Sequence, residues 1–397
     1  MFNESEFKMK FGTHKLVQNS EQRDVRWRPV GKLLACVAMA TAMLSGCGTL
    51  ADWRDENKGI QMDALKTPPG LTVTLFATAL PKAREMALSP GGTLFVGSNA
   101  GNVYALTLSG NQIKKQRTII TGIIDPSGIA FKDGALYVSA RTKVLRYDDI
   151  ENRLDNPPAP ITVIDGFPDK QRHGAHYMAF GPDQKLYVSV GSPCDLCEAQ
   201  NDEHGTIIRV NPDGSGKEVV ARGIRNTVGF DWHPQTKELW FTEQGQDNLG
   251  TELPTDKLNR LTKLGENFGF PYCHDGNIAN PEYGGKRACS EFTGPAFALG
   301  AHTSALGMRF YTGDAVPKLY QGNIIVTRHG SHPPTRVGYD VVRVVMNGNK
   351  PERMEPLLTG FLQGMKYWGR PADVLLMADG GLLITDDLNG AIYRVGP

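Results

Sequence analysis

The sequence predicts an all-β protein folded as a six-bladed β-propeller, and three observations support this prediction. Glycine and proline account for 45 and 25 of the 397 residues, and long amphipathic helical patterns are hard to find. A unit of apolar strand, turn and apolar strand occurs six times, each time followed by a further strand. Repeats of about 40 to 50 residues that contain only strands and turns are typical of propeller blades.

The six units share an equivalent apolar position in their second strand. Successive equivalents are 42, 50, 53, 86 and 58 residues apart, so the chain between the fourth and fifth units is unusually long. Residues 243–305 are too many for an ordinary blade connection, and long loops on a rigid scaffold often carry function. The strand at 70–80 has no partner before the first unit, and we expect it to close the ring by joining the last blade. The equivalent positions are Leu94, Leu136, Leu186, Leu239, Ile325 and Leu383.

The strand that leaves each unit carries arginine at its third place in five of the six units. We expect these arginines to fix the blade edges through hydrogen bonds, because a guanidinium group offers several donors at once. They are Arg146, Arg209, Arg260, Arg343 and Arg394.

Residues 1–46 are expected to be a lipoprotein signal peptide. Basic residues precede an apolar run at 33–46, which is too short to span a bilayer as a helix. The run ends in LSGC, which resembles a bacterial lipoprotein box in which Cys47 becomes the acylated first residue. Residues 47–69 would then form a linker and residues 70–397 the propeller. The protein is therefore expected to be exported, periplasmic and lipid-anchored at Cys47, with an ordinary secretory peptide as the alternative.

Once Cys36 is removed with the leader and Cys47 is acylated, four cysteines remain, and an even number in an oxidising compartment indicates disulfides. The expected pairs are Cys194 with Cys197 and Cys273 with Cys289. A zinc site made by Cys194, Cys197, Cys273 and His274 is the alternative, although the spacing lacks a second close cysteine pair.

The charge balance excludes one class of partner. The chain has 43 basic and 42 acidic side chains, so it has no net basic field that would bind nucleic acid.

Polar residues stand ahead of the inner strands at places where the strand pattern does not need them. In a propeller these places surround one mouth of the central channel, so we expect the side chains to converge there. Several arginines at one mouth indicate an anionic ligand, because guanidinium binds carboxylates and phosphates in a bidentate fork. The residues are Arg84, His173, His176, Arg225, Asn226 and His302, with Arg328 and Arg370 expected at the same mouth.

His173 is the expected general base, because an imidazole near its ordinary pKa can accept a proton at neutral pH. His176, three residues further on, is the alternative bearer of this role. The common nucleophile and nucleotide motifs, such as G-x-S-x-G, the Walker loop and H-E-x-x-H, do not occur.

Eight motifs in order resemble the quinoprotein sugar dehydrogenases, in particular the L-sorbosone dehydrogenase branch. The resemblance covers roughly residues 70–397. It rests on HGAHYMAFGPDQKLYVSVG, ARGIRNTVGFDWHP, LWFTEQG, LGTELPTDKLNRL, FGFPYCHDG, LGMRFYTG, HGS and GRPADVLLMADGGLLITDD.

The resemblance implies a six-bladed propeller that holds pyrroloquinoline quinone (PQQ) and Ca²⁺ at the channel mouth. Members of this family oxidise the C1 hydroxyl of sugars or a hydrated aldehyde by hydride transfer to the quinone. The implied partners are a sugar or sugar aldehyde and an external electron acceptor, either a cytochrome or a quinone. The three carboxylates of PQQ would explain the surplus of arginines.

The resemblance also implies roles for individual residues. His173 matches the base, while Arg225 and Asn226 match the pair that contacts the reactive quinone carbonyl and stabilises charge developing there. Arg328 stands in the place of a cofactor-binding lysine, and Arg370 matches a carboxylate-binding arginine. Arg84, from the arginine cluster, is expected to bind the cofactor as well.

Backbone carbonyls after the E-x-G motif are the implied Ca²⁺ ligands, which places the ion on Gly245 and Gln246. Carbonyl oxygens suit a hard cation whatever the side chain. Arg172 stands where the glucose-oxidising branch has an acidic partner of the base, so sugar specificity does not transfer.

The leading hypothesis is therefore a PQQ-dependent sugar dehydrogenase. Two alternatives stay open on the residues alone. One is a metal-dependent propeller hydrolase of the lactonase type, which normally needs carboxylates directed at the channel metal. The other is a non-catalytic binding propeller that has kept the fold.

Overall fold

The computed structural model describes residues 59–397, except 248, 315, 317 and 333–335. The expected signal peptide, Cys47 and the first part of the expected linker lie outside the described residues.

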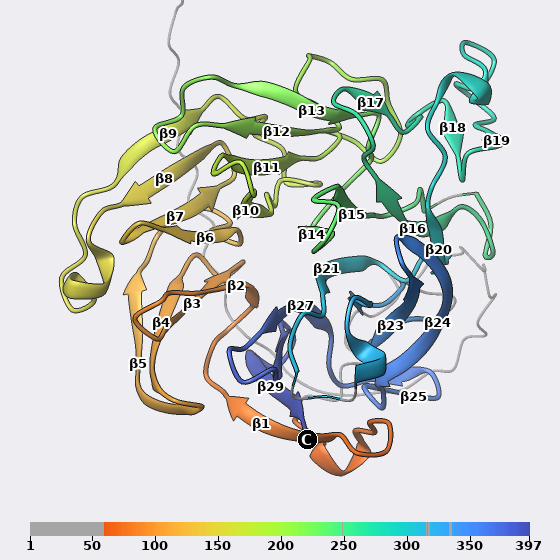
Figure 1. Ribbon diagram of the computed structural model, residues 1–397. Helices are drawn as coiled ribbons and strands as arrows, with labels where there is room; N and C mark the ends of the chain where they lie inside the picture. Colours follow the sequence, from red (N-terminus) through yellow and green to blue (C-terminus); the bar gives the residue numbers. More distant parts are fainter. Residues whose placement is uncertain (1–58, 248, 315, 317, 333–335) are drawn as a thin grey trace, which may run out of the picture. The chain divides into compact units, whose positions relative to one another are not determined.

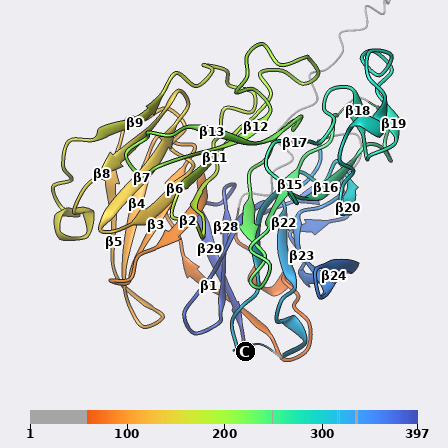
Figure 2. The same ribbon diagram turned by 45° about the horizontal axis from the view of Figure 1, so that its top comes forward.

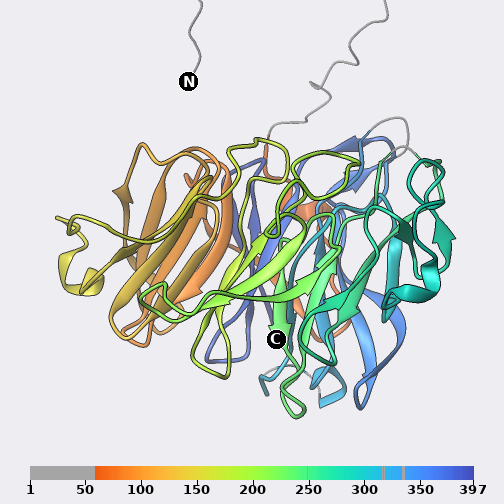
Figure 3. The ribbon, with the colours of Figure 1, turned by 90° about the horizontal axis from the view of Figure 1, so that it is seen from above.

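Six antiparallel sheets of four main strands succeed one another around a centre, which confirms the six-bladed propeller (Figure 1). The first strands of the blades, β2, β6, β10, β14, β21 and β27, lie on the inner side of the ring (Figure 1). Views from two further directions show the same succession of blades (Figures 2 and 3).

The strand bounds follow the predicted units. Blade 1 contains β2 (Ala83–Leu88), β3 (Thr93–Ser98), β4 (Val103–Ser109) and β5 (Gln112–Ile120). Blade 2 contains β6 (Ile129–Lys132), β7 (Ala135–Ala140), β8 (Lys143–Tyr147) and β9 (Ile161–Asp165). Blade 3 contains β10 (Met178–Phe180), β11 (Leu186–Val190), β12 (Thr206–Val210) and β13 (Glu218–Arg222). Blade 4 contains β14 (Phe230–Trp232), β15 (Leu239–Glu243), β16 (Thr255–Arg260) and β20 (Phe297–Ala301). Blade 5 contains β21 (Ala305–Phe310), β22 (Ile324–Arg328), β23 (Asp340–Asn347) and β24 (Lys350–Leu358). Blade 6 contains β27 (Pro371–Leu376), β28 (Leu382–Asp386), β29 (Ala391–Gly396) and β1 (Thr72–Ala77).

Strand β1 closes the ring, as the sequence predicted. It pairs antiparallel with β29, with Thr72 opposite Gly396 and Leu75 opposite Tyr393. The first and last parts of the propeller therefore share one sheet, which removes a long open edge.

The second strands form the centre of each blade. Strands β3, β7, β11, β15 and β28 are buried along their whole length, whereas the outer β5 is exposed or partly buried except at its last two residues. Apolar side chains of neighbouring blades pack together, as Phe95 of blade 1 does with Leu136 and Val138 of blade 2. Runs of apolar residues in these strands are buried because sheets cover both of their faces.

The five repeated arginines lie in the third strands, and each forms an ion pair with a nearby carboxylate. Arg260 binds Glu238 at 2.7 Å and Arg209 binds Glu218 at 2.7 Å. The expectation that they fix blade edges is confirmed. The remaining pairs are Arg146 with Asp148, Arg343 with Glu355 and Arg394 with Asp379.

Insertions lie within blade 4 and between blades 5 and 6. Strand β17 (Glu266–Asn267) pairs in parallel with β13 of the preceding blade, and β18 (Cys273–His274) forms a hairpin with β19 (Ile278–Ala279). A second hairpin joins β25 (Leu362–Gln363) to β26 (Lys366–Tyr367). The short 3-10 helices are η1 (Met62–Ala64), η2 (Ile150–Arg153), η3 (Cys289–Glu291) and η4 (Lys318–Tyr320).

Part of the expected linker packs on the propeller. Leu65 is buried with residues of blades 5 and 6, and Lys66 exchanges two backbone hydrogen bonds with Thr359. None of the described helices is long and apolar enough to cross a membrane.

Both predicted disulfides are present, Cys194–Cys197 and Cys273–Cys289. The zinc alternative is wrong, because these sulfur atoms are bonded in pairs and none is a free thiolate.

Candidate active site

Two adjoining hollows bring together residues from the entrances of several blades. Their volumes are about 450 and 210 Å³, and they share Gln171, His173, Gln244 and Ser304. We call them together the mouth cleft. The larger hollow also contains Arg172, Arg225, Gly245, Asp247, Asp256 and His332. The smaller one adds Arg84, Gly174, Ala175, Asn226, Val228, Leu306 and His329.

The mouth cleft therefore contains five of the eight residues predicted for the site. His173 precedes β10, Arg225 and Asn226 precede β14, and Gly245 follows β15. Arg84 lies in β2 of blade 1. These residues are far apart in the sequence and meet because the equivalent ends of the inner strands surround one centre.

His173 is held so that one ring nitrogen remains available. Its Nδ1 lies 2.9 Å from the carbonyl oxygen of Ser192. A carbonyl only accepts hydrogen bonds, so Nδ1 carries the proton and Nε2 of the neutral ring has the lone pair. Burial, and next the charge of Arg225, lower the pKa of His173 to about 3. The imidazole is therefore neutral at physiological pH and has a lone pair on Nε2. The pKa predicted from the sequence, near the ordinary value, is wrong because the ring is buried beside Arg225.

The backbone of His173 is also unusual. Its φ is 56°, in the left-handed region that few side chains adopt. Gly191 passes so closely that a Cβ there would lie 2.6 Å from Cβ of His173 and 2.8 Å from Oδ1 of Asn226. A glycine is required at position 191 because any Cβ there would collide with the side chains of His173 and Asn226.

His176 has a different environment. Its Nδ1 lies 2.7 Å from the carbonyl of Ser189 and its Nε2 lies 2.9 Å from the carbonyl of Arg141. Both ring nitrogens therefore face backbone acceptors, and the residue is 2% exposed. The geometry favours His173 over His176 as the base.

Arg225 is buried and bound by two carboxylates. Its Nε donates to the carbonyl of Asp195 at 3.1 Å, and its Nη2 contacts the carboxylates of Asp195 and, at 3.1 Å, Asp247. Its backbone N–H donates to Glu243. No described residue accepts from Nη1, so this nitrogen keeps its donors for a ligand in the mouth cleft.

Asn226 lies beside it. Its Nδ2 donates to Oε1 of Gln244 at 3.0 Å, and Gln244 in turn donates from its backbone to the carbonyl of Asn226. Its Oδ1 is buried and has no hydrogen-bond partner among the described residues. A buried amide with an unused polar atom is uncommon, and in a cleft it indicates a place for a ligand.

The predicted metal ligands lie on a turn fixed by Asp256. This buried carboxylate accepts from the backbone of Gly245 at 2.9 Å and of Ala305 at 2.9 Å. No described residue donates to the carbonyl of Gly245 or Gln246. Gly245 lines the mouth cleft, whereas Gln246 is buried and does not line it. No cluster of three or more acidic, histidine or cysteine side chains suited to a metal occurs among the described residues.

Arg84 and Arg370 meet at one buried carboxylate. Asp387 contacts Nη1 of Arg84 at 3.2 Å, and its other oxygen lies 3.0 Å from both Nε of Arg370 and Nε2 of His329. His329 and the two arginines hold the pKa of Asp387 well below its usual range, against the effect of burial. Arg370 thus lies next to the mouth cleft, although it does not line the two hollows.

Arg328 and His302 do not line the mouth cleft, although they are close in sequence to residues that do. Arg328 forms a bidentate pair with Asp340 of the neighbouring strand at 2.7 and 2.6 Å and donates to the carbonyl of Leu299. His302 contacts the carbonyl of Gly250 through Nε2. Neither residue lines the described hollows.

Sequence reasoning missed the carboxylates of the site. Asp195, Asp247 and Asp387 lie in loops or turns and Asp256 lies in strand β16, and no local pattern in the sequence distinguishes them from ordinary surface acids. The one usable signal is that Asp195 lies inside the C-D-L-C motif.

Fold and site together define a six-bladed propeller with a neutral histidine and a buried arginine at one channel mouth. The model of the Glucose / Sorbosone dehydrogenase family matches residues 139–394. A protein of Borreliella burgdorferi is 30% identical over 347 residues, which cover 83% of this chain and 90% of that protein. This chain belongs to the glucose/sorbosone dehydrogenase family, a family of sugar oxidoreductases.

Solved structures confirm the fold. A Carbohydrate-Active Enzymes Family AA12 protein of Trichoderma reesei, solved with iodide and with calcium, gives TM-scores of 0.76 and 0.75 at 21% and 20% identity. The alignments cover 86% of this chain and 99% and 98% of those chains. The holo PQQ domain of a pyranose dehydrogenase from Coprinopsis cinerea gives 0.71 at 18% identity, covering 84% and 97%.

Proposed function

We propose that this protein is a PQQ-dependent dehydrogenase that oxidises the C1 hydroxyl or hydrated aldehyde of a sugar of the sorbosone or aldose type. The observation that carries the proposal is His173, a neutral base whose Nε2 is available in the mouth cleft beside the unused Nη1 of Arg225. Family membership supports the sugar substrate, and the holo structure of the pyranose dehydrogenase domain supports PQQ.

The residues of the mouth cleft fit such a cofactor. Arg84, Arg225 and Asn226 line it, and Arg370 lies behind Asp387 at its border. Nδ2 of Asn226 carries two N–H groups and donates one hydrogen bond to Gln244, so a second donor on this fixed amide remains for a ligand. Arg328 remains a proposed cofactor contact only if it exchanges its pair with Asp340 for a carboxylate of the ligand.

PQQ, when bound, would supply a quinone that accepts a hydride, which is two electrons and one proton, from C1 of the sugar. The protein supplies proton transfer and electrostatics. Nε2 of His173 takes the proton of the sugar hydroxyl, and Nδ1 stays protonated on the carbonyl of Ser192. Arg225 and Asn226 donate hydrogen bonds where negative charge develops, an arrangement that needs donors fixed in advance. Gly245 and Gln246 would hold Ca²⁺ through their carbonyls.

A reconstitution experiment tests this proposal. Chelator-treated protein, supplied with PQQ and Ca²⁺, should reduce a redox dye with a panel of aldoses and keto-aldehydes. Each addition alone should restore little activity. Recovery with a nicotinamide cofactor instead of PQQ would reject the proposal. The same panel identifies the sugar, and replacing the dye by a cytochrome or a soluble quinone identifies the acceptor.

We further propose that the protein is exported and lipid-anchored at Cys47, on the basis of the LSGC motif after a short apolar run. Expression of the Cys47→Ala variant in a bacterial host should leave unprocessed precursor or release the protein from the membrane fraction. A processed, membrane-bound variant would overturn this assignment.

A further inference from the structure

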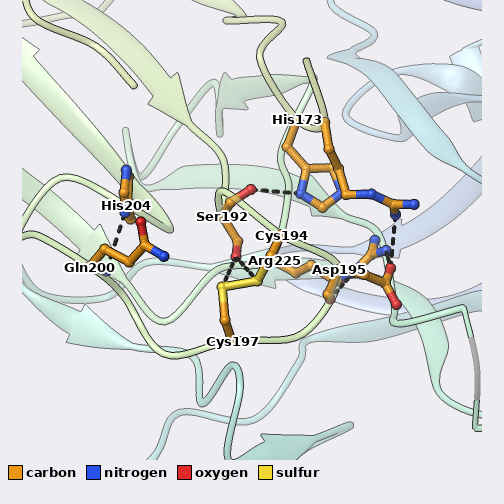
Figure 4. The surroundings of a disulfide bond; sticks show 9 residues. His173, Ser192, Cys194, Asp195, Cys197, Gln200, His204 and Arg225 are labelled. Atoms are coloured by element: carbon orange, nitrogen blue, oxygen red, sulfur yellow. Dashed lines mark hydrogen bonds and ion pairs between the residues drawn. A yellow bond between two sulfur atoms is a disulfide. The ribbon is translucent and has the colours of Figure 1, made fainter. Parts of the chain in front are cut away.

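The segment 192–197, which includes the loop closed by the Cys194–Cys197 disulfide, contacts both of the residues that carry the proposed chemistry (Figure 4). Ser192, just before the loop, accepts a hydrogen bond from Nδ1 of His173 at 2.9 Å. The backbone N–H of Ser192 donates to the carbonyl of Arg225 at 2.8 Å. One residue therefore fixes the base and the arginine together.

Asp195, inside the disulfide ring, adds two further contacts to Arg225. Its backbone carbonyl accepts from Nε at 3.1 Å, and its carboxylate binds Nη2. The two acceptors hold adjacent nitrogens of the guanidinium, so they fix the direction in which the unused Nη1 points. The side chain of Arg225 is 3% exposed and that of Asp195 is 24% exposed, so the pair is largely withdrawn from solvent.

The disulfide ring itself supplies the rigidity. Cys194 and Cys197 are separated by three positions, and the cross-link restricts the backbone between them, including the Asp195 carbonyl. Without the cross-link, this segment is a loop between β11 and β12 with few backbone hydrogen bonds of its own. Such segments open easily unless something ties them down.

We propose that the Cys194–Cys197 loop is a clamp that positions His173 and Arg225, with Asp195 as the positioning residue for Arg225. The proposal rests on the function proposed above for these two residues. Asp247 gives a built-in comparison, because its carboxylate also contacts Nη2 of Arg225 at 3.1 Å. It lies outside the disulfide ring, its side chain is 45% exposed, and no contact joins its backbone to Arg225.

A double-mutant cycle tests the role of Asp195. Asp195→Asn should lower kcat by roughly tenfold to a hundredfold and change KM less, because a charge-assisted hydrogen bond that orients a transition-state donor is lost. Asp247→Asn should lower kcat less than Asp195→Asn. Combined with Arg225→Ala, Asp195→Asn should add little further loss. Fully multiplicative losses would show that Asp195 acts independently of Arg225 and would overturn its assigned role.

Hydrogen exchange in the cofactor-free protein tests the clamp without any assay of activity. Cys194→Ser/Cys197→Ser should raise the exchange rates of peptides covering 171–176, 190–198 and 222–227. The control is Cys273→Ser/Cys289→Ser, which removes the other disulfide and has no described contact with His173 or Arg225. Lys286 of the Cys273–Cys289 loop and Tyr272 just before it bind Glu198, and the segment preceding them forms backbone hydrogen bonds to residues 222–223. The control therefore applies to the peptide covering 171–176, which it should leave unchanged. The clamp would be overturned if both double variants exchanged the peptide 171–176 at the same rate. It would also be overturned if the first variant exchanged its peptides no faster than the wild type.

The two experiments separate the clamp from the proposed function. If wild-type protein with PQQ and Ca²⁺ oxidises no sugar, the proposed function fails, while the exchange data still decide whether the loop holds residues 171–176 and 222–227. If wild-type protein is active and the loop variants keep both normal kcat and normal exchange, the clamp fails alone. Asp195→Asn keeps the disulfide, so it remains informative if the serine variants do not fold.

Discussion

The arginines at the mouth cleft and those at the outer blade edges all bind carboxylates, but with different consequences. Arg260 lies at the outer end of β16 and forms its pair with Glu238, in the turn just before the adjacent strand β15. Arg225 lies at the mouth and binds Asp195 and Asp247, which come from two separate loops. The pair of Arg260 lies within one blade. Arg225 instead joins two loops, and its Nη1 remains available to a ligand. The location in the fold, and not the residue type, thus separates a structural arginine from a functional one.

The largest expected effect at the mouth comes from removing the base. His173→Ala should lower kcat by roughly 10² or more, because proton transfer from the sugar hydroxyl loses its acceptor. Binding of PQQ, measured by titration of the cofactor-free protein, should persist. Near-normal single-turnover reduction of PQQ in this variant would show that His173 is not the base. The buried His176 would then be the next candidate for that role.

Arg225→Ala should be the next largest change. Loss of a preorganised donor to developing charge costs about 2.7–4 kcal/mol in the barrier, so single-turnover reduction should slow accordingly. Arg260→Ala is the matched edge control, and its rate should equal that of the wild type. Equal losses in the two variants would contradict the distinction between mouth and edge.

Arg370→Ala should weaken PQQ binding more than it slows turnover. We expect the affinity to fall by roughly tenfold to a hundredfold, the size of a lost charge-assisted hydrogen bond. Excess cofactor should then restore much of the rate. A low rate that persists at saturating cofactor would instead place Arg370 in the catalytic step, or show that Asp387 depends on it.

The pKa of His173 offers a comparison that needs no cofactor. Burial and the charge of Arg225 lower this pKa to about 3, from 6.5 in an unfolded chain. Because the folded pKa is the lower one, the neutral ring stabilises the fold above pH 6.5, and this contribution is lost as the pH falls toward 3. Ring-proton NMR should show no His173 titration between pH 7 and 5. In Arg225→Ala the midpoint should rise, whereas in Arg260→Ala it should stay, and a wild-type midpoint near 6.5 would contradict the burial of the ring.

The smallest effect is expected at the blade edge. Arg260→Ala removes a partly exposed ion pair, which typically contributes about 0.2–1 kcal/mol to the free energy of unfolding. Urea denaturation should detect a change in this range, with kcat unaltered. A loss of several kcal/mol would mean that the edge pairs do more than fix neighbouring strands.

The described part of the propeller could be predicted because its information is local. Each blade repeats an apolar strand, a turn and an apolar strand, so Leu94, Leu136 and their equivalents mark the buried second strands without knowledge of distant contacts. Both disulfides were predictable for the same reason, since their cysteines are close in sequence.

The candidate site could be predicted only in part. His173, Arg225 and Asn226 were singled out because they interrupt the strand pattern, and the structure brings them together. Arg328 interrupts the pattern equally well, yet it is paired with Asp340 outside the mouth cleft. The sequence shows that a polar residue departs from the apolar pattern of its strand. It does not show which residue will form a hydrogen bond or ion pair with it in the folded protein.

The sequence by itself determined the blade count, the closing strand and the family, because strand periodicity and ordered motifs are properties of neighbouring residues. Tertiary structure alone decided which of two histidines three residues apart keeps a ring nitrogen available. His176 places both nitrogens on backbone carbonyls, whereas His173 places only Nδ1 on one. The acceptors come from segments as far away as Arg141 and Ser192, so this difference is created only when the blades close around their centre.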